Sequence, residues 1–358
     1  MHYLKLHKEL MIKTALFLKT KNIGDSIILT SSIAALPKAF KYVDVMCLPE
    51  SESIFKMNPR VRDIFVIPRH LKGLKKLSAY YKIFRKLISN HYDFLAQFSV
   101  DWRGALLARL LNADLSVARE ALRRGSFWHH SFDLIAPLKD NRPIAEQDVD
   151  LLRVAKLYQK TEAPSYQLSA PHKNQLKIKK WLQAQHISKN KLIVIHASSR
   201  WKFKEIPIET WANVIDALKA KKINVVLSGS KEDLKTNQSI ADLCLLKPIL
   251  THDFSIEDTT ALYEMADLVA TIDSMSTHLA SAMNTPVISI FGPTNDLNWR
   301  PWKVKYQVIN LSKADDPTFA CRPCGMDGCE GTKVSQCLVQ MKPEMILKSI
   351  GKIFLLQN

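Results

Sequence analysis

The sequence predicts an α/β protein made of two Rossmann-like domains, each built on a parallel sheet. A chain of 358 residues is too long for one compact core. In both halves, short apolar segments alternate with amphipathic segments of about 10–15 residues, as in parallel strands joined by right-handed helical crossovers. The stretch 161–171 has two prolines and little periodicity, which is typical of a linker. We therefore expect domains at 1–170 and 171–358 that face a central cleft, with a last helix that can pack back on the first domain.

The first half contains four expected strands and three expected helical segments. The strands are 14–19, 42–47, 64–67 and 94–98, and the helices are 25–40, 70–88 and 103–111. In the basic segment 70–88, one stripe carries apolar and aromatic residues with lysines and arginines around it, namely Leu74, Leu77, Tyr81, Phe84 and Ile88. This pattern fits either a core helix with a solvated basic face or a helix lying on an anionic membrane surface.

The second half has a more regular alternation. Strands are expected at 192–196, 224–228, 268–272 and 287–291, and helices at 208–220 and 231–245. Ser255 and Asp258 form a predicted capping box that opens a helix through Ala266.

The net charge of +17 requires an acidic partner, which could be nucleic acid, an anionic bilayer or an acidic substrate. No run of about 18 apolar residues predicts a membrane span. Lysines bracket the apolar stretch 15–18 and no small-residue cleavage site follows, so it reads as a first strand and not as a signal peptide. Residues 1–10 add little recognisable structure, which makes Met11 a candidate start. A cytoplasmic location is expected.

The most informative segment runs from a buried strand through Asp273, Ser274, Met275 and Ser276 into a helix that carries His278. A helix N-terminus at the carboxyl end of a parallel sheet attracts phosphate. The segment therefore predicts a phosphate-bearing ligand with a polar contact to its sugar. The alternative is that Asp273 only caps the helix and His278 is an ordinary satisfied polar residue.

A second turn, 19–30, follows the first strand and contains Gly24 and Asp25. It lacks the three glycines of a dinucleotide fingerprint and the Gly-Lys-Ser/Thr pattern of a P-loop. Asp25 can act as a general base on a substrate hydroxyl, or it can simply be a helix N-cap.

A third loop follows the strand 192–196 and combines small hydroxyls with cations. Such a loop can cradle an anion, and either Lys202 or Lys204 could neutralise a diphosphate leaving group without a metal. The alternative is a solvated basic loop with Trp201 packed beneath it.

Four of the six cysteines gather near the C-terminus, at Cys321, Cys324, Cys329 and Cys337. One C-x-x-C pair with two single cysteines can hold structural zinc. The alternatives are reduced thiols packed in a loop or disulfides, which a reducing compartment disfavours.

Together these segments resemble the ADP-heptose:lipopolysaccharide heptosyltransferases, glycosyltransferase family 9. The resemblance covers nearly the whole chain through residues 23–25, 29–30, 198–204, 273–278, 291–294 and 299–302 and the cysteine-rich tail. The loop 200–204 is most similar to the branch that adds a third heptose to the inner core.

The resemblance implies a GT-B architecture with an acceptor-binding first domain and a donor-binding second domain. It implies an inverting transferase that uses ADP-heptose and needs no catalytic metal or other cofactor. By position, Asp25 would be the general base and Lys204 would bind the donor diphosphate. The donor-binding residues would be Ser198, Ser199, Arg200, Lys202, Asp273, Ser274, Met275, Ser276 and His278. Many relatives have glycine where Met275 stands, and glycine lets a backbone approach phosphate most closely.

The acceptor implied by the resemblance is the phosphorylated inner core of lipopolysaccharide, at the cytoplasmic face of the inner membrane. Peripheral association with that membrane would explain the charge of +17 and the basic segment. Acceptor-binding residues would be Gly24, Lys72, Lys75 and Lys76.

Two other functions stay open at this point. A sugar-nucleotide epimerase on the same scaffold would turn over its donor without a lipid acceptor. A basic nucleic-acid-binding protein with a structural zinc cluster would explain the charge. However, it would leave residues 273–278 unused, and no nucleic-acid motif is present.

Overall fold

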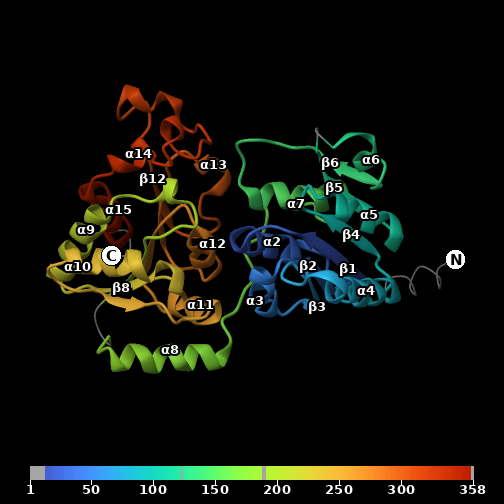
Figure 1. The fold of residues 1–358 in the computed structure, drawn as a ribbon, viewed down its shortest axis with the longest axis horizontal. Coiled ribbons are helices and arrows are strands. Elements are labelled where there is room, and N and C mark those ends of the chain that lie inside the picture. The colour runs from blue at the N-terminus through green and yellow to red at the C-terminus, as the bar shows by residue number, and fades with distance from the viewer. Residues whose placement is uncertain (1–12, 122–123, 188–190, 356–358) are drawn as a thin grey trace. The chain divides into compact units, whose positions relative to one another are not determined.

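The computed structural model describes residues 13–121, 124–187 and 191–355. The candidate start Met11 lies outside this part of the chain. The chain divides into two compact units, Met1–Leu168 and Ser169–Asn358. Figure 1 shows that each unit has a central sheet with helices packed around it.

The first unit contains a six-stranded parallel sheet with the order β3-β2-β1-β4-β5-β6. Its strands are β1 (Lys13–Lys19), β2 (Phe40–Cys47), β3 (Val61–Val66), β4 (Phe94–Gln97), β5 (Ser116–Arg119) and β6 (Leu134–Ala136). Its α-helices are α2 (Ile23–Ala35), α3 (Glu52–Lys56), α4 (Gly73–Ser89), α5 (Trp102–Leu111), α6 (Gly125–His129) and α7 (Ile144–Val154).

The second unit repeats the same plan with the order β12-β11-β10-β7-β8-β9, again with every pair parallel. Its strands are β7 (Leu192–His196), β8 (Asn224–Ser228), β9 (Ile249–Thr251), β10 (Leu268–Ile272), β11 (Val287–Ile290) and β12 (Tyr306–Ile309). Its α-helices are α8 (His172–Ala184), α9 (Ile208–Ala220), α10 (Leu234–Leu243), α11 (Ile256–Glu264), α12 (Met275–Ala282), α13 (Asp296–Trp299), α14 (Gln336–Val339) and α15 (Pro343–Leu355).

The central strands form from continuous apolar runs because both faces of each sheet are covered. All five residues of β7 and of β10 are buried. The last helix, α15, packs on α9, β11 and β12 through Ile346, Ile350 and Ile353, which are at most 3% exposed. Its apolar stripe is therefore used within the second unit's own core.

The predicted α/β class with two parallel sheets is confirmed, and one helix boundary differs for an identifiable reason. The helix expected at 25–40 spans Ile23–Ala35. It stops there because Pro37 disfavours helical backbone at Leu36, which adopts an extended conformation with ψ 139°. The predicted capping box at Ser255 and Asp258 is present.

The packing of α4 corrects one reading of the sequence. As a core helix it would bury its apolar stripe, yet Leu74, Leu77, Tyr81 and Ile88 are 51–84% exposed. The helix instead packs on the unit through Tyr80, Ile83 and Leu87, of which only Leu87 is fully buried. Within the described residues, no helix has the length and apolar character needed to cross a membrane.

Candidate active site

Each sheet has a point at which the strand order reverses, and the predicted site residues follow the strands at these two points. The chain builds outward from β1 through β2 and β3, then returns to place β4 on the other side of β1. The second unit repeats this with β7 and β10. Loops diverge at the carboxyl ends of such neighbouring strands, and ligands of open α/β sheets bind in the space between them.

Asp25 lies in the first turn of α2, at the carboxyl end of β1. The helix N-cap is Asn22, so the alternative that Asp25 is the cap is wrong. The Asp25 side chain is 17% exposed, and its Oδ1 lies 3.8 Å from the Nζ of Lys19. Asp25 is therefore accessible to solvent and held from one side by a cation.

Lys19 belongs to a buried charge cluster that the sequence did not reveal. Its side chain is 3% exposed, and its Nζ donates to Asp148 Oδ2 at 2.9 Å. Arg119 pairs with the other oxygen of Asp148, whose side chain is fully buried. Asp148 comes from α7, which packs against α2. A second carboxylate thus fixes the cation beside Asp25.

The loops around this switch point are hydrogen-bonded to each other. The backbone N–H of Thr20, after β1, donates to Ser99 Oγ at 2.9 Å, after β4. The Thr20 hydroxyl lies 3.4 Å from a carboxylate oxygen of Asp101, the N-cap of α5. Of the predicted acceptor-binding residues, Gly24 lies in the first turn of α2. Lys72, Lys75 and Lys76 lie at the start of α4.

In the second unit, the structure joins the two predicted loops through one ion pair. Lys204 Nζ donates to Asp273 Oδ2 at 2.6 Å, across 69 residues of sequence. The side chains are 20% and 10% exposed. An ammonium group has three donors, so one contact to Asp273 leaves two for a ligand.

The start of α12 has a defined cap. Ser274 is the N-cap and accepts a hydrogen bond from the backbone N–H of Ser276 at 3.3 Å. The alternative that Asp273 caps this helix is therefore wrong. The Ser276 hydroxyl accepts from Tyr263 at 2.9 Å and is buried, so it anchors the helix and does not face solvent. Met275 is the first helical residue.

His278 is 4% exposed, and burial lowers its pKa to about 4. The Lys204 ammonium lowers this pKa further, whereas Asp273 opposes the shift. The ring lies 6.1 Å from that of Trp299. At neutral pH, His278 therefore supplies hydrogen-bonding groups but no positive charge to a ligand.

Only part of the remaining loop after β7 offers groups for a ligand beside Lys204 and Asp273. Ser198 is 1% exposed, and its hydroxyl has no partner among the described residues, so a donor or acceptor remains to be satisfied there. Ser199 donates its N–H to Glu205 at 2.9 Å, and Lys202 pairs with the same carboxylate. Lys204, not Lys202, thus occupies the switch point.

Two other residues of this loop lie on the surface. Trp201 is 52% exposed, so the alternative in which it packs beneath the loop is wrong. Arg200 is also exposed.

The cysteine cluster is only partly gathered. All six cysteines are free, with Cys337 buried, Cys329 half-buried and Cys321 and Cys324 exposed. Burial raises the pKa of the Cys337 thiol to about 11, with smaller contributions from the other three cysteines, which are therefore neighbours. Among the described residues, no three of the four sulfurs lie within 4.8 Å of one another.

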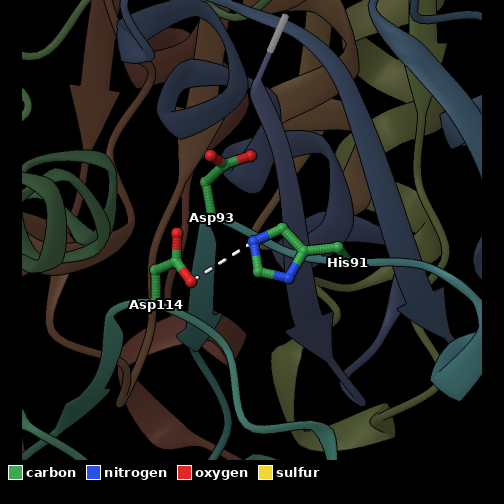
Figure 2. A group of neighbouring side chains, drawn as sticks. All are labelled: His91, Asp93 and Asp114. Atoms are coloured by element: carbon green, nitrogen blue, oxygen red, sulfur yellow. Dashed lines mark ion pairs between the residues drawn. The ribbon is translucent and has the colours of Figure 1, made fainter. Parts of the chain in front are cut away.

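A different trio meets that spacing: His91, Asp93 and Asp114, drawn in Figure 2. His91 Nε2 lies 3.2 Å from Asp114 Oδ1, and both side chains are at least 60% exposed. Asp93 already accepts a hydrogen bond from the backbone of Thr14 at 2.8 Å. Because these residues precede β4 and β5, the trio lies at the amino ends of the strands, whereas Asp25 lies at the carboxyl end of β1.

The sequence profile of glycosyltransferase family 9 (heptosyltransferase) matches residues 80–325. A lipopolysaccharide heptosyltransferase 3 of Escherichia coli is 30% identical over 290 residues, which cover 78% of this chain and 83% of that protein.

Solved structures share the fold over nearly the whole chain. A glycosyl transferase family 9 protein from Veillonella parvula DSM 2008 matches with a TM-score of 0.81 at 18% identity, covering 97% of this chain and 98% of that one. The E. coli ADP-heptose lps heptosyltransferase II matches with a TM-score of 0.74 at 17% identity, covering 96% and 99%. The expected GT-B fold is thereby confirmed, and the chain belongs to glycosyltransferase family 9, the heptosyltransferases.

Proposed function

We propose that the protein transfers heptose from ADP-heptose to the inner core of lipopolysaccharide, with inversion at the anomeric carbon and without a catalytic metal. The 30% identity to the E. coli lipopolysaccharide heptosyltransferase 3 supports this acceptor class and the third-heptose branch. The name of the E. coli ADP-heptose lps heptosyltransferase II supports the donor. The observation that carries the proposal is the Lys204–Asp273 pair at the switch point of the second unit.

In this mechanism the second unit binds the donor. The ammonium group of Lys204 donates two N–H hydrogen bonds to the diphosphate. The N-terminus of α12 adds the positive end of its helix dipole. Asp273 carries a negative charge, so it suits sugar hydroxyls better than phosphate, and it fixes the ammonium of Lys204. The unsatisfied hydroxyl of Ser198 offers a further hydrogen bond. Lys204, the N-terminus of α12 and the Ser198 hydroxyl together stabilise the negative charge that develops on the leaving ADP.

The first unit supplies the base. Asp25 accepts the proton of the acceptor hydroxyl, whose oxygen attacks the anomeric carbon from the side opposite ADP. The new glycosidic bond forms as the bond between that carbon and the diphosphate oxygen breaks, so ADP leaves with the electron pair. Lys19 and Asp148 position the Asp25 carboxylate. Gly24, Lys72, Lys75 and Lys76 are proposed to meet the phosphorylated acceptor, which lies at the cytoplasmic face of the inner membrane.

The cysteines are assigned no role in transfer. We propose that Cys321, Cys324, Cys329 and Cys337 bind structural zinc. The support is that the four thiols belong to one short segment and that thiolates are the ligands that zinc prefers. Because no three of these sulfurs lie within 4.8 Å of one another among the described residues, zinc would have to draw them together. Zinc would then hold the segment after β12 in place and would not contact either substrate.

The test is to offer ADP-heptose together with a series of truncated core glycolipids. The mass and the glycosidic linkage of each product are then determined. Asp25→Asn should lose transfer by about a hundredfold or more while binding ADP normally. Asp114 is an exposed aspartate at the amino end of β5 in the same sheet, and Asp114→Asn should retain both transfer activity and ADP binding. EDTA should not slow the reaction.

Several outcomes would contradict the proposal. Normal transfer by Asp25→Asn would exclude the base assignment, and a strict need for added magnesium would exclude the metal-free mechanism. Turnover of ADP-heptose with no glycolipid present would indicate an epimerase instead.

A further inference from the structure

The first unit has an apolar surface formed by α4 and α5, which we name the α4–α5 face. On α4, Leu74 is 84% exposed and Leu77 66%. On α5, Trp102, Leu106 and Leu110 recur every fourth residue and are 55%, 40% and 51% exposed. Single exposed apolar side chains are ordinary, but two adjacent helices that both present apolar stripes indicate an interaction surface.

A groove of about 480 Å³ runs between the two helices. Its walls include Ile83 and Phe84 from α4, and Leu107 from α5. Its inner end reaches Thr20 and Asp101, at the carboxyl end of the sheet where Asp25 also lies. The size falls within the range of small-molecule sites, and the walls are mostly apolar. A chain-like apolar group could therefore extend from the α4–α5 face towards the end of the sheet that carries Asp25.

The charges around this surface are almost all positive. Lys72, Lys75 and Lys82 have no carboxylate within 4 Å among the residues that the structure describes. Arg85 lies over the Tyr81 ring, 6.0 Å from its centroid. Lys86 alone on α4 is paired, with Asp63 at 2.5 Å.

The combination of exposed apolar side chains and positive charges on the α4–α5 face favours one kind of partner over others. A second copy of the same face would bring these lysines against each other, and like charges across an interface are unfavourable. A nucleic acid would use the cations but would leave the leucines in water. An anionic bilayer satisfies both sets, because acyl chains accept the apolar side chains while lysine and arginine reach the headgroups.

We propose that the α4–α5 face docks on an anionic phospholipid bilayer. Leu74, Leu77 and Trp102 enter the headgroup and acyl boundary, Lys82 and Arg85 contact lipid phosphates, and the groove admits one acyl chain. The inference deepens the proposed function, since it names the surface through which the enzyme reaches a membrane-borne acceptor.

Flotation with vesicles tests the proposal in the absence of any sugar substrate. The full-length protein should float with vesicles of mixed phosphatidylglycerol and phosphatidylcholine and remain in solution with phosphatidylcholine alone. Lys82→Gln with Arg85→Gln should weaken vesicle binding about 30-fold, because each basic residue near an anionic surface contributes about fivefold. Leu74→Ser with Leu77→Ser should abolish flotation.

Matched controls come from the second unit. Lys179→Gln with Lys180→Gln removes two exposed positive charges from α8, and Leu245→Ser removes a leucine that is 88% exposed. Both controls should bind the vesicles normally. All of these variants should keep wild-type activity on a water-soluble acceptor fragment without acyl chains, so loss of docking is distinguishable from failure of the proposed reaction.

Three results would overturn the proposal. The first is equal flotation with neutral and anionic vesicles. The second is equal loss of binding in the α4 variants and the α8 control. The third is a concentration-dependent dimer that Leu74→Ser dissociates, which would assign the α4–α5 face to a second copy of this chain.

Discussion

Replacing Asp148 with asparagine removes the negative charge that two buried cations share. The Asp148 side chain is fully buried between Lys19, 3% exposed, and Arg119, 15% exposed. Removing one partner of a buried ion pair costs about 3–5 kcal/mol, because an uncompensated charge is left behind. Asparagine keeps the volume, and Asp25 remains 3.8 Å from Lys19, so we expect the lower value, about 3 kcal/mol.

Hydrogen exchange followed by mass spectrometry can assign this loss to the first unit. Exchange of the most protected amides in β1 and β4 should become about 150-fold faster, while β7 and β10 serve as an internal reference. Transfer should also slow, because Asp148 no longer anchors Lys19 and the lysine then positions Asp25 less well, but ADP binding should not change.

The matched control is Asp114→Asn, the same substitution in the same unit at an exposed ion pair with His91. It should change stability by less than about 0.5 kcal/mol. If Asp148→Asn exchanges no faster in β1 and β4 than this control, the buried cluster does not stabilise the unit and the reasoning fails.

Further predictions concern the second unit. Lys204→Met should weaken ADP binding at least tenfold by calorimetry, since a hydrogen bond to a charged group contributes about 1.5–3 kcal/mol, whereas Lys202→Met should have little effect. Because burial lowers the pKa of His278 to about 4, the unit should lose stability as the pH falls from 6.5 towards 4. His278→Gln should reduce this loss in the free energy of unfolding by up to about 3 kcal/mol, measured by denaturant unfolding at several pH values. Elemental analysis of the purified protein should find one zinc ion per chain, and the Cys329→Ser variant should contain none. Wild-type protein that is purified without zinc would exclude the zinc site.

Much of the second unit could be predicted because its strands are read from local composition. The segments 192–196 and 224–228 each have an apolar centre, and both strands have the predicted ends. The turn after β10 was informative for the same reason, since a buried strand followed by small polar residues predicted a helix start, although the cap is Ser274 and not Asp273. Local signals therefore located Asp273 and the loop with Lys202 and Lys204, and the family resemblance selected Lys204. The contact between Lys204 and Asp273 required the sheet order.

What could not be predicted depends on contacts between distant residues. Lys19 and Asp148 are 129 residues apart, and no spacing rule joins them. The apolar stripe of α4 was visible in the sequence, but periodicity does not tell which stripe of a helix a neighbouring element covers. In this case Tyr80 and Ile83 pack inward while Leu74 faces outward.

The division of the chain at Leu168 and Ser169 has an evolutionary consequence. The polypeptide passes from one unit to the other once, and each has its own sheet, core and switch point. Recombination at this junction would exchange one half of the protein without cutting a sheet. Under the proposed division of labour, such chimeras would pair the nucleotide-sugar preference of one parent with the glycolipid preference of the other.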